Sequence, residues 1–187
     1  VLRGVKLSGR DLKGIDLRGA SMQGANLEGA DLTGAKLDGA QLHRCRLVDA
    51  VLRDVSAEGA VLDDARLNGA QLAGLNASKS RCVGADFRGT SWGQVSFVGA
   101  DLSAARLSQV DVEDADLREV LLEQCDMVGA TLSRARVEGM EAEGALGLSG
   151  AEMAALEARG AKVNALSLSW LKWFGEAEGR ATLVARM

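Results

Sequence analysis

Apolar residues recur at every fifth position along the first three quarters of this chain. Starting at Leu2, all 29 positions of this five-residue series are hydrophobic, and the series ends at Ala142. The residue two places before each member is mostly small, and the residue two places after it is Gly in 16 of 28 cases between Gly4 and Gly139. An internal repeat of this kind indicates the architecture before any local motif is considered.

Neither an α-helix nor a flat β-strand satisfies a period of five. A step of five residues rotates about 140° around a helix, so the series would form no apolar stripe. Five is odd, so successive members would point to opposite faces of a strand. The chain must therefore turn once per pentapeptide and stack its turns as a solenoid. The competing interpretation is a disordered Gly/Ala-rich tract, which a hydrophobic content of 47% disfavours.

Several pentapeptides have the sequence A-(D/N)-L-x-x, including residues 25–29, residues 30–34 and the segment that begins at Ala100. They resemble the repeat unit of the pentapeptide-repeat family, and the resemblance covers about residues 1–145. It implies an all-β solenoid, a right-handed quadrilateral β-helix with four pentapeptides per coil and the Leu and Ala positions pointing inward. About seven coils spaced by roughly 4.8 Å then give a rod on the order of 34 Å long.

One stretch of the series carries aromatic residues instead of leucine. Phe87, Trp92 and Phe97 follow one another in it, and Ala57 and Ala77 precede Phe97 in the stack of residues 20 apart. We interpret the three aromatic residues as structural core, with large side chains compensating for small ones. The alternative is an aromatic ligand pocket.

The sequence shows no arrangement typical of catalysis or metal binding. Cys45, Cys82 and Cys125 occupy inward positions, and the first and last are about 19 Å apart at the coil spacing, too far for a disulfide. They are typical of a reducing compartment, so we expect a cytoplasmic protein. His43 is the single histidine, and no phosphate-binding loop is present. We therefore expect no enzyme, no metal and no cofactor.

Acidic residues are concentrated late in the repeat. Residues 1–100 carry 13 basic and 11 acidic side chains, whereas residues 101–142 carry 4 and 10. They lack the spacing of a calcium-binding loop. They are either an ordinary solvated surface or a negative surface for a basic partner. The candidate surface consists of Asp101, Asp111, Glu113, Asp114, Asp116, Glu119, Glu123 and Asp126.

The repeat register ends near Ala145, which divides the chain into a β-helix over 1–145 and a cap or dimerisation segment over 146–187. Ser149 and Glu152 have the spacing of a capping box, which predicts a helix to about Ala158, with Gly160 at its end. A second apolar segment follows. It covers the open end of the solenoid or pairs two copies in a homodimer. Its candidate residues are Leu166, Leu168, Trp170, Leu171, Trp173 and Phe174.

The function that these observations favour is a non-enzymatic scaffold for a protein partner. The family resemblance implies a more specific alternative, because some members mimic duplex DNA, occupy the DNA-binding saddle of DNA gyrase and confer antibiotic resistance. A net charge of −4 and an unbroken register depart from that pattern. A third alternative is an adaptor, an effector or a domain of a larger secretion-related protein. We expect no direct binding of nucleic acid or membrane, and we expect Arg10 to lie in a frayed first coil.

Overall fold

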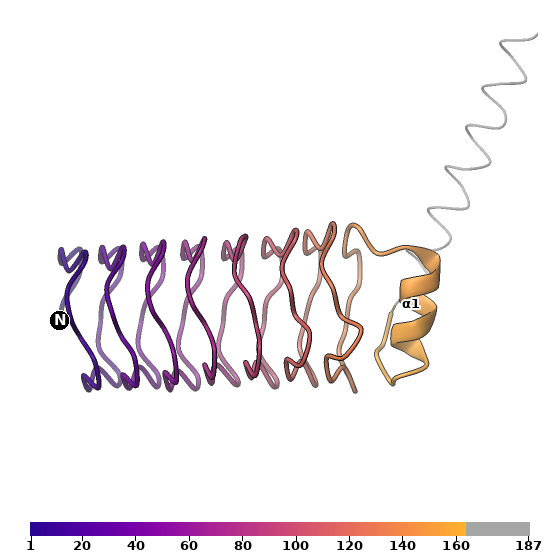
Figure 1. Ribbon diagram of the computed structural model, residues 1–187, viewed down its shortest axis with the longest axis horizontal. Coiled ribbons are helices and arrows are strands. Elements are labelled where there is room, and N and C mark those ends of the chain that lie inside the picture. Colours follow the sequence, from indigo (N-terminus) through magenta and orange to yellow (C-terminus); the bar gives the residue numbers. More distant parts are fainter. Residues whose placement is uncertain (164–187) are drawn as a thin grey trace, which may run out of the picture.

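The computed structural model describes residues 1–163, which form a rod of stacked coils followed by a short helix (Figure 1). Parallel β-bridges join residues 20 apart, from Lys6 and Asn26 to Asp126 and Leu146. Four pentapeptides therefore complete each turn, and the rod has four flat faces. We call the bridging residue, which stands directly before each member of the five-residue series, the face-centre residue. The solenoid predicted from the period of five is confirmed.

The four faces repeat one hydrogen-bond pattern. We number them by their face-centre residues: 21, 41 and 61 begin face I, 26, 46 and 66 face II, 31, 51 and 71 face III, and 36, 56 and 76 face IV. The amide of Leu27 donates to the carbonyl 19 residues later, on Arg46, at 2.8 Å. The amide of Arg46 donates to the carbonyl 21 residues earlier, on Ala25, at 3.0 Å. Each amide of this kind ties one coil to the next.

Glycine is required where corners of successive coils meet closely. Gly69 has φ +69°, and a Cβ at this position would lie 2.3 Å from Oδ1 of Asp49 in the preceding coil. A side chain there would combine backbone strain with a steric clash. Asp49 itself has φ 56°, so a non-glycine residue occupies the same conformation one coil earlier. The repeated Gly of the sequence therefore reflects the turn, and its replacements are tolerated where space allows.

The inward positions form one continuous core. From Met22 to Ala142 the members of the five-residue series are buried, and most of the small residues beside them are less than 5% exposed. Members in the first coil are less covered, since Leu2 is 37% exposed. Arg10, which replaces a small inward residue in that coil, is exposed. Its charge therefore remains in water.

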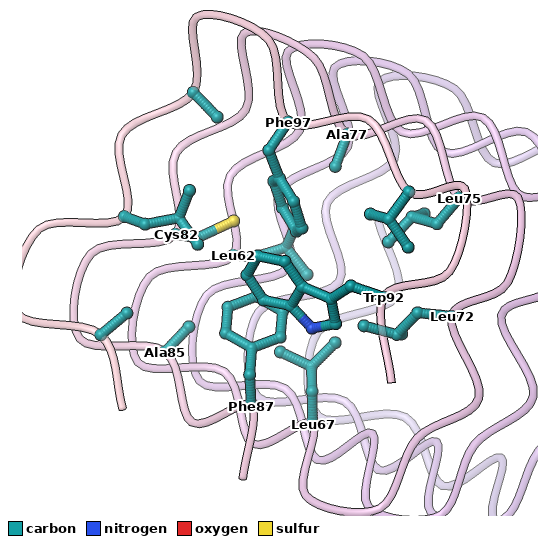
Figure 2. Close-up of a cluster of buried hydrophobic side chains, with 14 of the residues drawn as sticks. Leu62, Leu67, Leu72, Leu75, Ala77, Cys82, Ala85, Phe87, Trp92 and Phe97 are labelled. Carbon is teal, nitrogen blue, oxygen red and sulfur yellow. The ribbon is translucent and has the colours of Figure 1, made fainter. Parts of the chain in front are cut away.

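Three aromatic rings fill the middle of the rod. Phe87, Trp92 and Phe97 are at most 1% exposed, and Figure 2 shows the indole in the centre of the coil between the two phenyl rings. The Trp92 and Phe97 centroids are 4.7 Å apart, and Phe87 meets both rings edge-on. An apolar cavity of about 20 Å³ adjoins the phenyl rings, Ala57 and Ala77. The rings thus fill most of the space that the two alanines leave, and they line no pocket open to a ligand.

Thr90 provides the hydrogen-bond partner of the buried indole. Nε1–H of Trp92 donates to Oγ1 of Thr90 at 2.9 Å, and Thr90 is 4% exposed. The β-ladder of face III is incomplete beside this pair. Within the described residues the amides of Ser91 and Asp111 donate no backbone hydrogen bond, whereas the equivalent amide of Ser96 on face IV donates at 2.9 Å. We attribute the gap to Thr and Trp, which widen this wall relative to Ala and Leu.

The helix α1, Gly150–Glu157, begins at the predicted position. The side chain of Ser149 accepts the amide of Glu152, and the Glu152 carboxylate accepts the amide of Ser149, so the predicted capping box is confirmed. The helix buries Met153 and Leu156. It lies beyond the last coil of the rod (Figure 1).

The chain returns from α1 to the rod and extends its ladder over part of the end. The amide of Lys162 donates to the carbonyl of Met140 at 2.6 Å, and the amide of Gly139 donates to the carbonyl of Gly160 at 2.8 Å. Lys162 also forms an ion pair of 2.8 Å with Glu141, its bridge partner. The end is therefore closed by the return strand together with α1. The candidate residues of the second apolar segment, Leu166 to Phe174, lie outside the described residues.

Candidate protein-binding site

The predicted acidic surface is divided by the coil register. Residues close in sequence separate because each pentapeptide starts a new face. Only three of the eight carboxylates stay together, at the centre and following corner of face III: Asp111, Glu113 and Asp114. The other five lie on face I and its corner (Asp101 and Glu123), face II (Asp126), and face IV and its corner (Asp116 and Glu119).

Four of these carboxylates stabilise the corner that follows them. In each case Oδ1 accepts the amide of the residue two places later, which forms an Asx turn. The repeated ladder leaves this corner amide without a backbone acceptor, so an Asp or Asn before Leu satisfies it. This explains the A-(D/N)-L pattern without any partner. The bonds, of 3.0 to 3.3 Å, run from Ser103 to Asp101, Glu113 to Asp111, Arg118 to Asp116 and Val128 to Asp126.

Arginines neutralise the acidic groups to different degrees. Arg134 is 2.7 Å from Glu113 and 3.0 Å from Asp114, so one guanidinium serves both carboxylates. On face IV, Asp116 pairs with two arginines, Arg118 at 2.7 Å and Arg136 at 3.4 Å. The hydrogen bond from Arg118 is the main cause that lowers the pKa of Asp116. The face III group therefore keeps excess negative charge, whereas Asp116 does not.

A groove lies between α1 and the last wall of face III, next to the acidic group. Small and aliphatic side chains provide most of its surface, and two carboxylates stand at its rim. The lining residues are Ala130, Leu132, Ala155 and Leu156, with Thr131, Ser133, Glu113 and Glu152. The groove thus combines an apolar floor with an acidic border.

The wall at this groove is an open β-edge. In the regular ladder the amide of Leu132 would donate to residue 151, but residue 151 lies in α1. Among residues 1–163 this amide donates no hydrogen bond, and the carbonyl of Ala130 accepts no backbone amide. On the neighbouring face the guanidinium of Arg159 donates to the equivalent carbonyl, on Ala135, and to the carbonyl of Leu132 at 2.9 Å. One edge is therefore capped by a side chain, and the other is not.

The rim of the groove is net negative. Four carboxylates, those of Asp111, Glu113, Asp114 and Glu152, stand against one guanidinium, that of Arg134, which leaves three negative charges. Hydrogen bonds from Ser149 lower the pKa of Glu152, so this carboxylate is ionised at neutral pH. The sequence identified Glu152 only as part of a helix cap. Its position beside Glu113 depends on the return path of the chain, for which no sequence signal exists.

The remaining polar groups form no comparable site. His43 lies at an exposed corner with Arg44, Asp63 and Asp64. No cluster of three or more potential metal ligands occurs among the residues that the structure describes. The three cysteines are free and buried, and burial raises the pKa of Cys82 to about 12. Such thiols are unreactive at neutral pH.

No helix in residues 1–163 is long and apolar enough to cross a lipid bilayer. The helix α1, with its eight residues, is far below the roughly 20 that a span requires.

Comparisons with known proteins agree with the repeat and the coil. The family model described as pentapeptide repeats matches eight copies, over residues 1–39, 11–47, 45–81, 80–118 and 113–145. A sequence search of the curated proteins gives no match. Among solved structures, HetL, a pentapeptide repeat protein involved in heterocyst differentiation regulation in Nostoc sp. strain PCC 7120, is 23% identical with a TM-score of 0.52, covering 76% of this chain and 72% of its own.

Two further solved structures are more distant. QnrB1, a plasmid-mediated fluoroquinolone resistance protein, is 18% identical over 93% of this chain and 96% of its own, with a TM-score of 0.48. A pentapeptide repeat protein of the Arabidopsis thaliana thylakoid lumen is 20% identical over 85% and 82%, with a TM-score of 0.40. At these identities the likeness concerns the fold alone.

Proposed function

Because this chain belongs to the pentapeptide-repeat family, whose repeats cover residues 1–145, we propose that it is a non-enzymatic scaffold that binds a basic protein partner. The contact surface is the acidic end of face III, where Asp111, Glu113 and Asp114 border the groove beside α1. The observation that carries the proposal is this local excess of negative charge next to an apolar floor. A rigid solenoid suits recognition by a fixed array of side chains.

Electrostatics give this surface its direction. Unneutralised carboxylates at a rim attract a basic partner over a Debye length of about 8 Å at physiological ionic strength. Such charge complementarity raises the association rate and selects the partner more than it raises affinity. The apolar floor then provides the short-range contact. A location in the cytoplasm fits three buried, reduced cysteines.

A narrower alternative is that the rod mimics duplex DNA, binds DNA gyrase and confers antibiotic resistance. A duplex mimic needs negative charge along a whole face. Face III carries Asp31 and Asp111 near its ends, but Val51, Gln71 and Ser91 occupy its centre. This uncharged middle favours a local basic partner over a DNA-binding saddle. A supercoiling assay separates the two, because only the alternative expects inhibition of gyrase or protection from a quinolone at micromolar protein.

The family also implies features that complete this proposal. They are right-handed winding, about seven coils, and a homodimer formed through the residues after Val163. A crystal structure tests the winding, and light scattering on the full chain tests the dimer.

The proposal is tested by removing charge while keeping the corner hydrogen bonds. The triple variant Asp111→Asn, Glu113→Gln and Asp114→Asn retains every oxygen that accepts a bond in the Asx turn. Proteins captured by the wild-type chain from a bacterial extract are compared with those captured by the variant, and affinities are then measured by calorimetry with the purified candidate. We expect at least a tenfold loss of affinity.

The matched control neutralises three carboxylates at the other end of the rod, Asp11→Asn, Asp16→Asn and Asp31→Asn. These residues form the same kind of Asx turn. The control should bind like the wild type. Equal binding by both triple variants and the wild type would show that the acidic end of face III is not the contact surface.

A further inference from the structure

We propose that the groove beside α1 takes an extended segment of the partner, which adds to face III as one more strand. Alternate side chains of that segment lie on the apolar floor, and a Lys or Arg between them meets the acidic rim. This inference rests on the proposed function and specifies the form in which the partner presents its basic residues.

The open edge provides the backbone part of the site. Elsewhere in the rod a coil is tied to the next by an amide such as that of Val112, which donates to the carbonyl of Thr131 at 3.2 Å. At the last wall of face III the amide of Leu132 and the carbonyl of Ala130 have no such partner within residues 1–163. An added strand that bridges Thr131 satisfies both groups, as in other cases of β-addition. An unpaired edge of this kind favours extended backbone over a helix.

The floor sets the size of the side chain that fits. Ala130 and Ala155 are small, while Leu132 and Leu156 are 8% and 2% exposed and form the apolar base. A groove bordered by alanines accommodates a short aliphatic side chain such as valine. Residues on either side of it in an extended strand point away from the floor, toward the rim.

The rim selects a cation at those flanking positions. Glu113 already accepts a hydrogen bond from Ser133 and pairs with Arg134, so its charge is only partly compensated. Asp114 shares the same arginine, and Glu152 faces them from α1. A lysine or arginine of the partner restores neutrality. A glutamate at the same place would add to the negative charge and be excluded.

The test uses a fluorescein-labelled peptide in which valine and lysine alternate over nine residues, titrated with the full-length chain and followed by anisotropy. The second probe is the same peptide with N-methyl groups on the central valine and lysine, which keeps the charge but removes the backbone donors. We expect N-methylation to weaken binding at least tenfold. Glu113→Gln with Asp114→Asn should weaken the unmodified peptide at least tenfold, and Asp11→Asn with Asp31→Asn by less than twofold.

Hydrogen exchange of the full chain gives a second readout. The amide of Leu132 should exchange rapidly in the free protein and become protected by the valine–lysine peptide. Protection of this amide without peptide would assign the groove to later residues of this chain or to a second copy, and would overturn the inference.

Equal affinity for the methylated and unmodified peptides would also overturn it, while leaving a charge-based partner surface intact. Failure of the charge-removing variant to weaken binding would instead contradict the proposed function. The two failures are therefore distinguishable.

Discussion

The hydrogen bond between Thr90 and Trp92 gives the most specific prediction about stability. Replacing Thr90 by Val keeps the volume of the side chain and removes its hydroxyl. The indole Nε1–H of Trp92, at 0% exposure, then loses its one partner, which lies 2.9 Å away. Leaving a buried donor unsatisfied costs about 1–3 kcal/mol. The Phe87 carbonyl stays paired, because it also accepts the amide of Thr90 at 3.1 Å.

Two further variants separate the hydroxyl from the volume. Thr90→Ser keeps the hydroxyl and loses one methyl group, so it should cost no more than about 1 kcal/mol. Thr131→Val removes an exposed hydroxyl that donates to Asp111 at 3.1 Å, and it should change stability by less than about 0.5 kcal/mol.

The measurement is urea unfolding of the four proteins, followed by far-ultraviolet circular dichroism and by tryptophan fluorescence. Coincident transitions are required before free energies of unfolding are compared, since solenoids can lose cooperativity. Thr90→Val should be the least stable of the four. If it unfolds within about 0.5 kcal/mol of the wild type, the indole has another partner and the account of this core is refuted.

Three further predictions concern the core, the ladder and the charged corners. Phe97→Ala should enlarge the existing cavity and cost about 3–5 kcal/mol in a denaturant melt, and a loss below about 1 kcal/mol would place the ring outside the core. Amide exchange should be faster at Ser91 and Asp111 than at Ser96, and equal rates would show that the face III ladder is complete. Burial raises the pKa of Asp86, but stronger hydrogen bonding from its neighbours lowers it to about 2. Stability should therefore fall as pH drops from about 4 to 2, and Asp86→Asn should reduce this loss in acid-unfolding curves.

The rod was predictable because one physical constraint acts at every repeat. A period of five, with a turn once per pentapeptide, requires the series from Leu2 to Ala142 to face one interior. The capping box of Ser149 and Glu152 was equally readable, since it depends on residues three apart. The four-sided coil was implied only by the family resemblance, because the number of corners per turn is not encoded in the period.

The site was much less predictable. The eight acidic residues are neighbours in sequence, but each corner directs the next pentapeptide to another face, so only three stay together. The role of an Asp before Leu as an acceptor for a corner amide was not recognised, although its repetition was a signal. Glu152 and Arg159 reach the last coil through the return path after Gly147, and no spacing rule relates them to Glu113 or Ala135. Thr90 was detectable in principle, as a hydroxyl at a small inward position two residues before Trp92.

The central claim is that the acidic end of face III is where this scaffold meets its partner. The most direct measurement is hydrogen-exchange mass spectrometry of the full chain with and without the purified basic protein that it captures. The account predicts that protection is confined to the segments that form this end, residues 110–116, 130–134 and 150–157. Protection confined to the first coils, or to the corner around His43, would contradict it.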